Sequence, residues 1–169
     1  PLILINTFLA AAFGLLTGLG ISFALFKKPD PYYVILGPLA GLVAITAGCN
    51  SMTSVTAILV GIIGAIISIF VNEILNKYEI DDVVGAVPVH LAAGIWGTLA
   101  VGLFSDLELL DTGLTRLEQI EVQFIGVVSI GAFSFFGAYI LLKILNYFYP
   151  LRVSPLHEEL GLNIAEHNA

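Results

Sequence analysis

The histidine at position 90 is the residue whose type and surroundings most suggest chemistry. It lies in the apolar stretch Val87–Gly97, which has the character of a membrane helix. Ionisable residues inside a membrane span are costly, and they often mark substrate or ion pathways. A neutral imidazole offers one hydrogen-bond donor and one acceptor. His90 is therefore a candidate functional residue, and the alternative is a buried histidine satisfied by a backbone carbonyl.

A proline and two acidic residues precede His90 along the chain. Pro88 cannot donate to the carbonyl four residues back, so the helix either begins near Ala86 or is kinked there. Broken helices often mark the pathway in transporters, although proline is also common in an ordinary first turn. Asp81 and Asp82 are expected to cap this helix and complement its dipole, with a catalytic carboxylate pair as the minor alternative.

Residues near the expected helix ends form a second group of candidates. Asn6 and Thr7 lie early in the first apolar stretch, and Ala86 lies at the expected start of the His90 helix. We take these three as candidate pore or helix-end contributors, although Ser and Thr in membrane helices often bond only their own backbone. The histidines outside the apolar stretches lack metal-ligand spacing, so the sequence predicts neither a metal site nor a cofactor.

The composition places these candidates in a membrane protein. Of 169 residues, 58% are hydrophobic and 11% are charged, and the mean hydropathy is +0.99. Soluble domains carry about 25% charged residues, which makes a water-soluble enzyme close to excluded. The net charge is −7 with only six Lys and Arg, so there is no basic stripe for nucleic acid. We expect a polytopic membrane protein, in contact with lipid, that is not an enzyme.

Five apolar stretches qualify as membrane spans, each of which needs about 20 residues as a helix. They run from about Leu2 to Phe26, Tyr33 to Ala47, Thr53 to Leu75, Val83 to Phe104 and Ile120 to Tyr149. The second is short. These runs lack the alternating polarity of barrel strands, and only helices satisfy every backbone group within them. The expected fold class is therefore an all-α membrane bundle.

The basic residues predict how this bundle is oriented. If the first helix runs from outside to inside, five of the six basic residues lie on the inner side: Lys27, Lys28, Lys77, Lys143 and Arg152. Only Arg116 then lies outside. We expect residues 1–149 to form the membrane part, with the N-terminus outside, and residues 150–169 to form a cytoplasmic tail.

Small residues recur at a spacing of four, which places each pair on one helix face and lets backbones approach closely. The pairs are Gly14 with Gly18, Gly37 with Gly41, Gly61 with Ala65, and Gly94 with Thr98. They predict a compact helical bundle and indicate no activity.

Several stretches resemble the ammonium transporter (Amt/Mep/Rh) family. Asp81–His90 followed by Gly94–Phe104 is similar to the penultimate-helix signature of that family. Ile5–Thr7 and Ala40–Cys49 look like its seventh and eighth helices, and the stretch that begins at Leu151 is similar to the tail of its bacterial branch. The similarity runs in order over essentially the whole chain.

The resemblance implies a fold of eleven helices, built from two inverted five-helix repeats and one long final helix, and assembled as a homotrimer. This chain would be helices seven to eleven. The chain begins with Pro1 and its only methionine is Met52, so we expect a fragment, a processed chain or one half of something larger. The resemblance implies that the missing part is the N-terminal half of the same protein. That half would hold the partner histidine, the outer recruitment site and the outer gate.

The resemblance also implies a function, which is transport of ammonium or ammonia through a narrow apolar pore. Two histidines would line the pore at mid-depth, and His90 matches the second. Removing a proton from ammonium and passing ammonia would exclude potassium, because a bare cation in an apolar pore costs several kcal/mol. Leu91 and Pro88 depart from the pattern of many members, so the packing there must differ. The alternatives are an ammonium sensor of the same fold that signals through a cytoplasmic partner, and an inactive fragment.

The resemblance also has implications for the tail, residues 150–169. The resemblance implies a cell (inner) membrane location, where a PII-type regulatory protein can plug the pore from the cytoplasm. Arg152, Glu158 and Glu159 would make such contacts, and the alternative is a solvated acidic tail.

Overall fold

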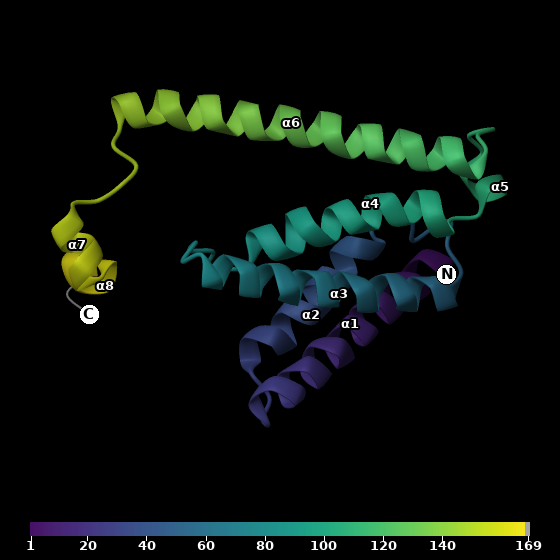
Figure 1. Ribbon diagram of the computed structural model, residues 1–169, viewed down its shortest axis with the longest axis horizontal. Coiled ribbons are helices and arrows are strands. Elements are labelled where there is room, and N and C mark those ends of the chain that lie inside the picture. The colour runs from purple at the N-terminus through teal and green to yellow at the C-terminus, as the bar shows by residue number, and fades with distance from the viewer. Residues whose placement is uncertain (168–169) are drawn as a thin grey trace. The chain divides into compact units, whose positions relative to one another are not determined.

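The computed structural model describes residues 1–167, and regular structure in this range is helical (Figure 1). The elements are α1 (Leu2–Phe26), α2 (Pro31–Ile45), α3 (Ser54–Lys77), η1 (Val87–Ala92), α4 (Ala93–Phe104), α5 (Leu107–Leu110), α6 (Arg116–Phe148), α7 (Pro155–Leu160) and α8 (Leu162–His167). The predicted all-α fold is confirmed.

Four helical segments are long and apolar enough to cross a membrane: α1, α3, η1 with α4, and α6. Helix α2 is apolar but has only 15 residues, in line with the short second stretch of the sequence. The fourth helix begins at Val87 rather than Val83, and the last begins at Arg116 rather than Ile120. The short helices α5, α7 and α8 lie in polar segments, where hydropathy gives no helical signal.

The chain forms two compact units, Pro1–Val127 and Val128 onward, and each is described by itself. In the first unit, α1, α2, α3 and the η1–α4 segment pack against one another, with α3 beside η1 and α4 (Figure 1). A Cβ on Gly14 would lie 2.5 Å from the Gly37 carbonyl oxygen, and one on Gly61 would lie 2.5 Å from the Ala10 carbonyl oxygen. The predicted close approach of helix backbones is therefore confirmed for α1, α2 and α3.

The glycine pairing predicted for α4 is wrong. A Cβ on Gly94 would meet only Val43 Cγ1, at 3.8 Å, and Thr98 donates its hydroxyl to the Gly94 carbonyl at 2.9 Å within the same helix. The close approach is instead at Gly97, where a Cβ would lie 2.2 Å from the Ala44 carbonyl oxygen. Spacing alone cannot identify the face of a helix that meets a neighbour, because several faces carry small residues.

Asn6 ties the start of α1 to the turn that connects α2 and α3. Its side chain is fully buried, and its Nδ2 donates to the carbonyls of Cys49 at 3.0 Å and Met52 at 2.7 Å. Its Oδ1 accepts the Ser54 hydroxyl at 3.0 Å. The side-chain amide thus satisfies groups that the turn leaves without backbone partners.

Replacing Asn6 with alanine should therefore lower the free energy of unfolding by about 1–3 kcal/mol, because buried polar groups lose their partners. Thermal unfolding of the purified protein in detergent measures this. Thr7→Ala is the matched control, since Thr7 is the next residue of the same helix and is half-buried. Equal stability of the two variants would show that the Asn6 bonds contribute nothing.

Candidate functional site

His90 lies in a π-helical turn at the start of the fourth membrane helix. In η1 the Ala93 N–H donates to the Pro88 carbonyl, five residues back, where an α-helix would use the residue four back. Pro88 and Val89 are buried, and His90 and Leu91 are exposed. The imidazole therefore occupies the face of the helix that α2 and α3 leave uncovered within the described chain.

The Pro88 carbonyl has a second donor. The Ser68 hydroxyl, fully buried on α3, donates to this oxygen at 2.7 Å. The carbonyl thus accepts one bond from within its own helix and one from the neighbouring helix. This contact fixes the position of the turn two residues before His90.

Asp82 satisfies the free amides at the start of η1. Its Oδ1 accepts the Ala86 N–H at 2.9 Å, and its Oδ2 accepts the Val87 N–H at 2.7 Å. These amides are donors that a helix start leaves unpaired, so the carboxylate stabilises the start of the segment. Gly85 precedes them with φ of 69°, a conformation that favours glycine. The alternatives for Pro88 are thereby resolved, because the helix begins beside Ala86.

The helix is also held after His90. Trp96 Nε1 donates to the Val60 carbonyl of α3 at 3.0 Å. Gly97 lets the backbone of α4 contact the backbone of Ala44 in α2. The rotation of α4 about its axis is therefore fixed by two neighbouring helices.

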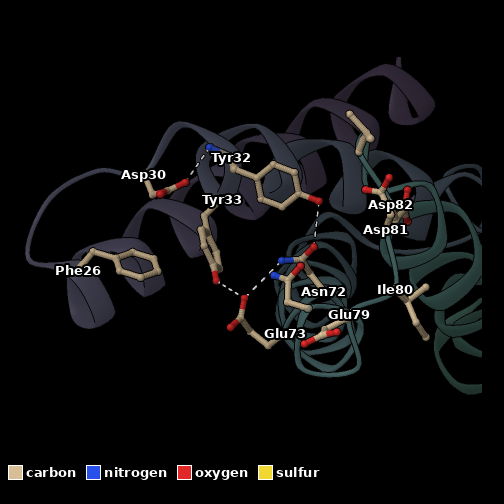
Figure 2. Close-up of a pocket in the computed structure, with 12 residues that line it drawn as sticks. Phe26, Asp30, Tyr32, Tyr33, Asn72, Glu73, Glu79, Ile80, Asp81 and Asp82 are labelled. Atoms are coloured by element: carbon tan, nitrogen blue, oxygen red, sulfur yellow. Dashed lines mark hydrogen bonds between the residues drawn. The ribbon is translucent and has the colours of Figure 1, made fainter. Parts of the chain in front are cut away.

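An acidic cleft of about 670 Å³ adjoins the turn before η1 (Figure 2). Five carboxylates line it: Asp30, Glu73, Glu79, Asp81 and Asp82. Tyr32 donates its hydroxyl to Asn72 Oδ1 at 3.0 Å, and the Tyr33 hydroxyl donates to Glu73 (Figure 2). The cleft therefore concentrates negative charge beside the Asp82 cap. No local pattern predicts it, because its walls come from separate helices.

Among the described residues, no three His, Cys, Asp or Glu side chains are grouped as a metal would require. The site offers an exposed imidazole, a capped helix start and an acidic cleft beside that cap. Such an arrangement can hydrogen-bond a small ligand and exchange a proton with it.

A sequence profile described as the Ammonium Transporter Family matches residues 2–169. The chain belongs to the ammonium transporter family. It is 43% identical over 169 residues to a candidate ammonium transporter of Synechocystis sp., a match that covers 100% of this chain and 31% of that protein. It is 39% identical over 174 residues to ammonium transporter Amt2 of Archaeoglobus fulgidus, covering 97% of this chain and 37% of that protein.

A solved structure of a sensor Amt protein superposes with a TM-score of 0.88 at 35% identity, over 98% of this chain and 42% of that one. The helical membrane fold expected from the resemblance is thus confirmed. The chain spans about a third of the length of the curated relatives it matches.

The remaining residues singled out in the sequence occupy varied positions in this ammonium transporter family member. Asn6 is buried in the fold, Thr7 is half-buried, and Ala86 is exposed at the start of η1. Asp81 is exposed beside the cleft. Ser68 could not be identified from the sequence, because one serine within an apolar helix gives no signal of a partner on another helix.

Two of the tail residues pair with each other. Arg152 Nε donates to Glu158 Oε1 at 2.9 Å, and Arg152 Nη2 donates to Glu158 Oε2 at 2.7 Å. These hydrogen bonds lower the pKa of the Glu158 carboxyl below its ordinary value and raise the pKa of Arg152. Glu159 is exposed. The pair joins Arg152, which precedes α7, to Glu158 within α7, whose first turn is capped by Ser154.

The lowered pKa of Glu158 gives this pair a definite pH dependence. The pair is complete above the ordinary glutamate pKa, and it is lost as the pH falls through the lowered value. Arg152→Ala should move the Glu158 pKa up toward its ordinary value of 4.5, as followed by NMR titration of the side-chain carboxyl. Lys143→Ala, which removes a different cation, is the control. An unchanged Glu158 titration in Arg152→Ala would contradict the pairing.

Proposed function

We propose that the protein containing this chain carries ammonium or ammonia across a membrane, and that this chain forms half of the pore. The observation that carries the proposal is the position of His90. It is an ionisable side chain on the uncovered face of a membrane-length helix whose start, rotation and backbone are fixed by neighbouring residues. Membership of the ammonium transporter family supports the choice of substrate.

The chemistry of His90 suits this substrate. The neutral imidazole can accept a hydrogen bond from ammonium or donate one to ammonia, and it can relay the proton between them. A cation in an apolar passage costs several kcal/mol, so passage as ammonia selects against potassium, which has no proton to release. The protein would move its ligand without altering it beyond proton transfer, and we therefore propose that it is not an enzyme.

The other residues have supporting roles in this proposal. Asp82 and Ala86 set the start of the His90 helix, and Asn6 and Thr7 belong to the opposite end of the bundle. Asp81 lies beside the cap. We place residues 1–149 in the bilayer of the cell (inner) membrane with the N-terminus outside, because five basic residues against one then lie inside.

We propose further that residues 150–169 form a cytoplasmic tail, in which Arg152, Glu158 and Glu159 contact a PII-type regulatory protein. The missing N-terminal half would cover the face that exposes His90, and the complete protein would be a homotrimer. That the chain spans about a third of its relatives supports a missing portion.

The second candidate function is ammonium sensing by the same fold, with the signal passed to a cytoplasmic partner. It is favoured by one observation, the superposition on a sensor Amt protein at a TM-score of 0.88. In that case the site would bind the ligand without passing it through the membrane.

Reconstitution of the full-length protein into liposomes distinguishes the two functions. Ammonium-dependent current or internal pH change would be measured against protein-free liposomes. Transport predicts flux well above that background. Binding of ammonium with flux equal to the background would reject transport and support sensing.

A further inference from the structure

The Ser68 hydroxyl has an unusual hydrogen-bond partner. Hydroxyls in apolar helices commonly donate to the carbonyl four residues earlier in their own helix. Thr17, Thr46 and Thr98 do so, to Phe13, Leu42 and Gly94 at 2.7, 2.7 and 2.9 Å. Ser68 instead donates across to Pro88 of η1 at 2.7 Å. Its position is buried, so water cannot replace this partner.

The acceptor is a carbonyl within the π-helical segment, which spans Val87–Ala92. In an α-helix the Pro88 carbonyl would accept from residue 92, but here it accepts from Ala93. A π turn leaves its carbonyls with longer backbone bonds, and a donor from a neighbouring helix can stabilise such a carbonyl; π turns are frequent at functional sites. Ser68 is thus placed to favour the longer turn over the ordinary one.

The type of turn determines where His90 points. One residue more or less in a turn rotates the preceding segment by about 100° about the helix axis, since a turn holds about 3.6 residues. The rotation of α4 is fixed independently by Trp96 and Gly97. A return to α-helical bonding between Pro88 and Ala93 would therefore turn His90 away from its present face.

We propose that Ser68 is a positioning residue for His90. Its hydroxyl holds the Pro88 carbonyl in the π turn, and the π turn presents the imidazole on the uncovered face of the helix. The role of Ser68 in transport rests on the proposed function, whereas its effect on the turn does not.

The structural test is a high-resolution structure of the full-length Ser68→Ala protein in lipid. We expect the Ala93 N–H to shift from the Pro88 carbonyl to the Val89 carbonyl, with displacement of the His90 ring. A π turn and a His90 position identical to those of the unmodified protein would overturn the proposal. This structural comparison can be made whether or not the protein transports ammonium.

The functional test measures ammonium flux in proteoliposomes, with Ser51→Ala as the matched control. Ser51 is also buried, and it donates to the Ser105 hydroxyl at 2.9 Å, away from η1. We expect flux to fall about tenfold in Ser68→Ala and to change less than about twofold in Ser51→Ala. If the two variants unfold at comparable temperatures, the lower flux of Ser68→Ala is not caused by loss of folding.

A double-mutant cycle tests whether Ser68 acts through His90. In a His90→Ala background, Ser68→Ala should change the residual flux less than about twofold, because there is no imidazole left to position. Equal losses from Ser68→Ala with and without His90 would overturn the positioning role. Absence of flux in the unmodified protein would instead reject the proposed function, and the structural test would then decide the role of Ser68.

Discussion

Replacing His90 with alanine in the full-length protein is expected to lower ammonium flux at least about tenfold, a rise of about 1.4 kcal/mol in the barrier. The reason is that alanine leaves an apolar gap where the ligand would otherwise find a hydrogen-bond partner and a proton acceptor. Flux into proteoliposomes, measured at matched protein content, gives the effect directly. Potassium would be measured in the same vesicles, because loss of the imidazole also removes the group proposed to select for a releasable proton.

Two further variants sharpen this test. His90→Gln keeps a donor and an acceptor but cannot titrate, so under proton relay it should be as slow as His90→Ala. His157→Ala is the control, since it removes a histidine that lies in the short helix α7 of the tail. Flux in His90→Gln equal to that of the unmodified protein would rule out a proton relay at this position. Unchanged flux in His90→Ala would show that His90 has no role in the pore.

The second large effect is expected at Gly97. A Cβ there would lie 2.2 Å from the oxygen and 2.8 Å from the carbonyl carbon of Ala44, both of which belong to the backbone of α2. Neither helix can yield locally, so Gly97→Ala must push α4 away from α2. We expect a loss of about 1–3 kcal/mol or more in the free energy of unfolding, measured by thermal unfolding in detergent.

Gly94→Ala supplies the matched control, three residues earlier in the same helix. Its Cβ would meet only Val43 Cγ1, at an ordinary contact distance of 3.8 Å. Because glycine is a poor helix former, this variant should be neutral or more stable by up to about 1 kcal/mol. If Gly97→Ala were as stable as Gly94→Ala, this would contradict a close contact between the backbones of α4 and α2 at Gly97. Since α4 carries η1, the destabilised variant should also lose ammonium flux.

Gly94 and Gly97 show that a residue pattern does not predict which glycine contacts a neighbouring helix. Both glycines sit in one apolar helix, and spacing made Gly94 the better candidate for a helix contact. The structure places Gly97 against its neighbour instead. The same limit applies to Ser68, whose partner lies 20 residues away along the chain. Nothing local to the sequence identifies such partners.

Local properties of the sequence determined much of this protein. Runs of apolar residues specified the membrane helices, because a bilayer offers no partner for an unpaired backbone group. The resemblance that begins at Asp81 and the cost of an ionisable group in a span pointed to the family and to His90. These inferences needed only neighbouring residues.

The face of the helix on which His90 lies is decided only by the tertiary structure. The π turn depends on a hydroxyl from α3, and the rotation of α4 depends on Val60 and Ala44, which belong to two other helices. The acidic cleft likewise arises where separate helix ends meet. The physical reason is that each feature is a contact between distant segments, and its geometry exists only once the helices have packed.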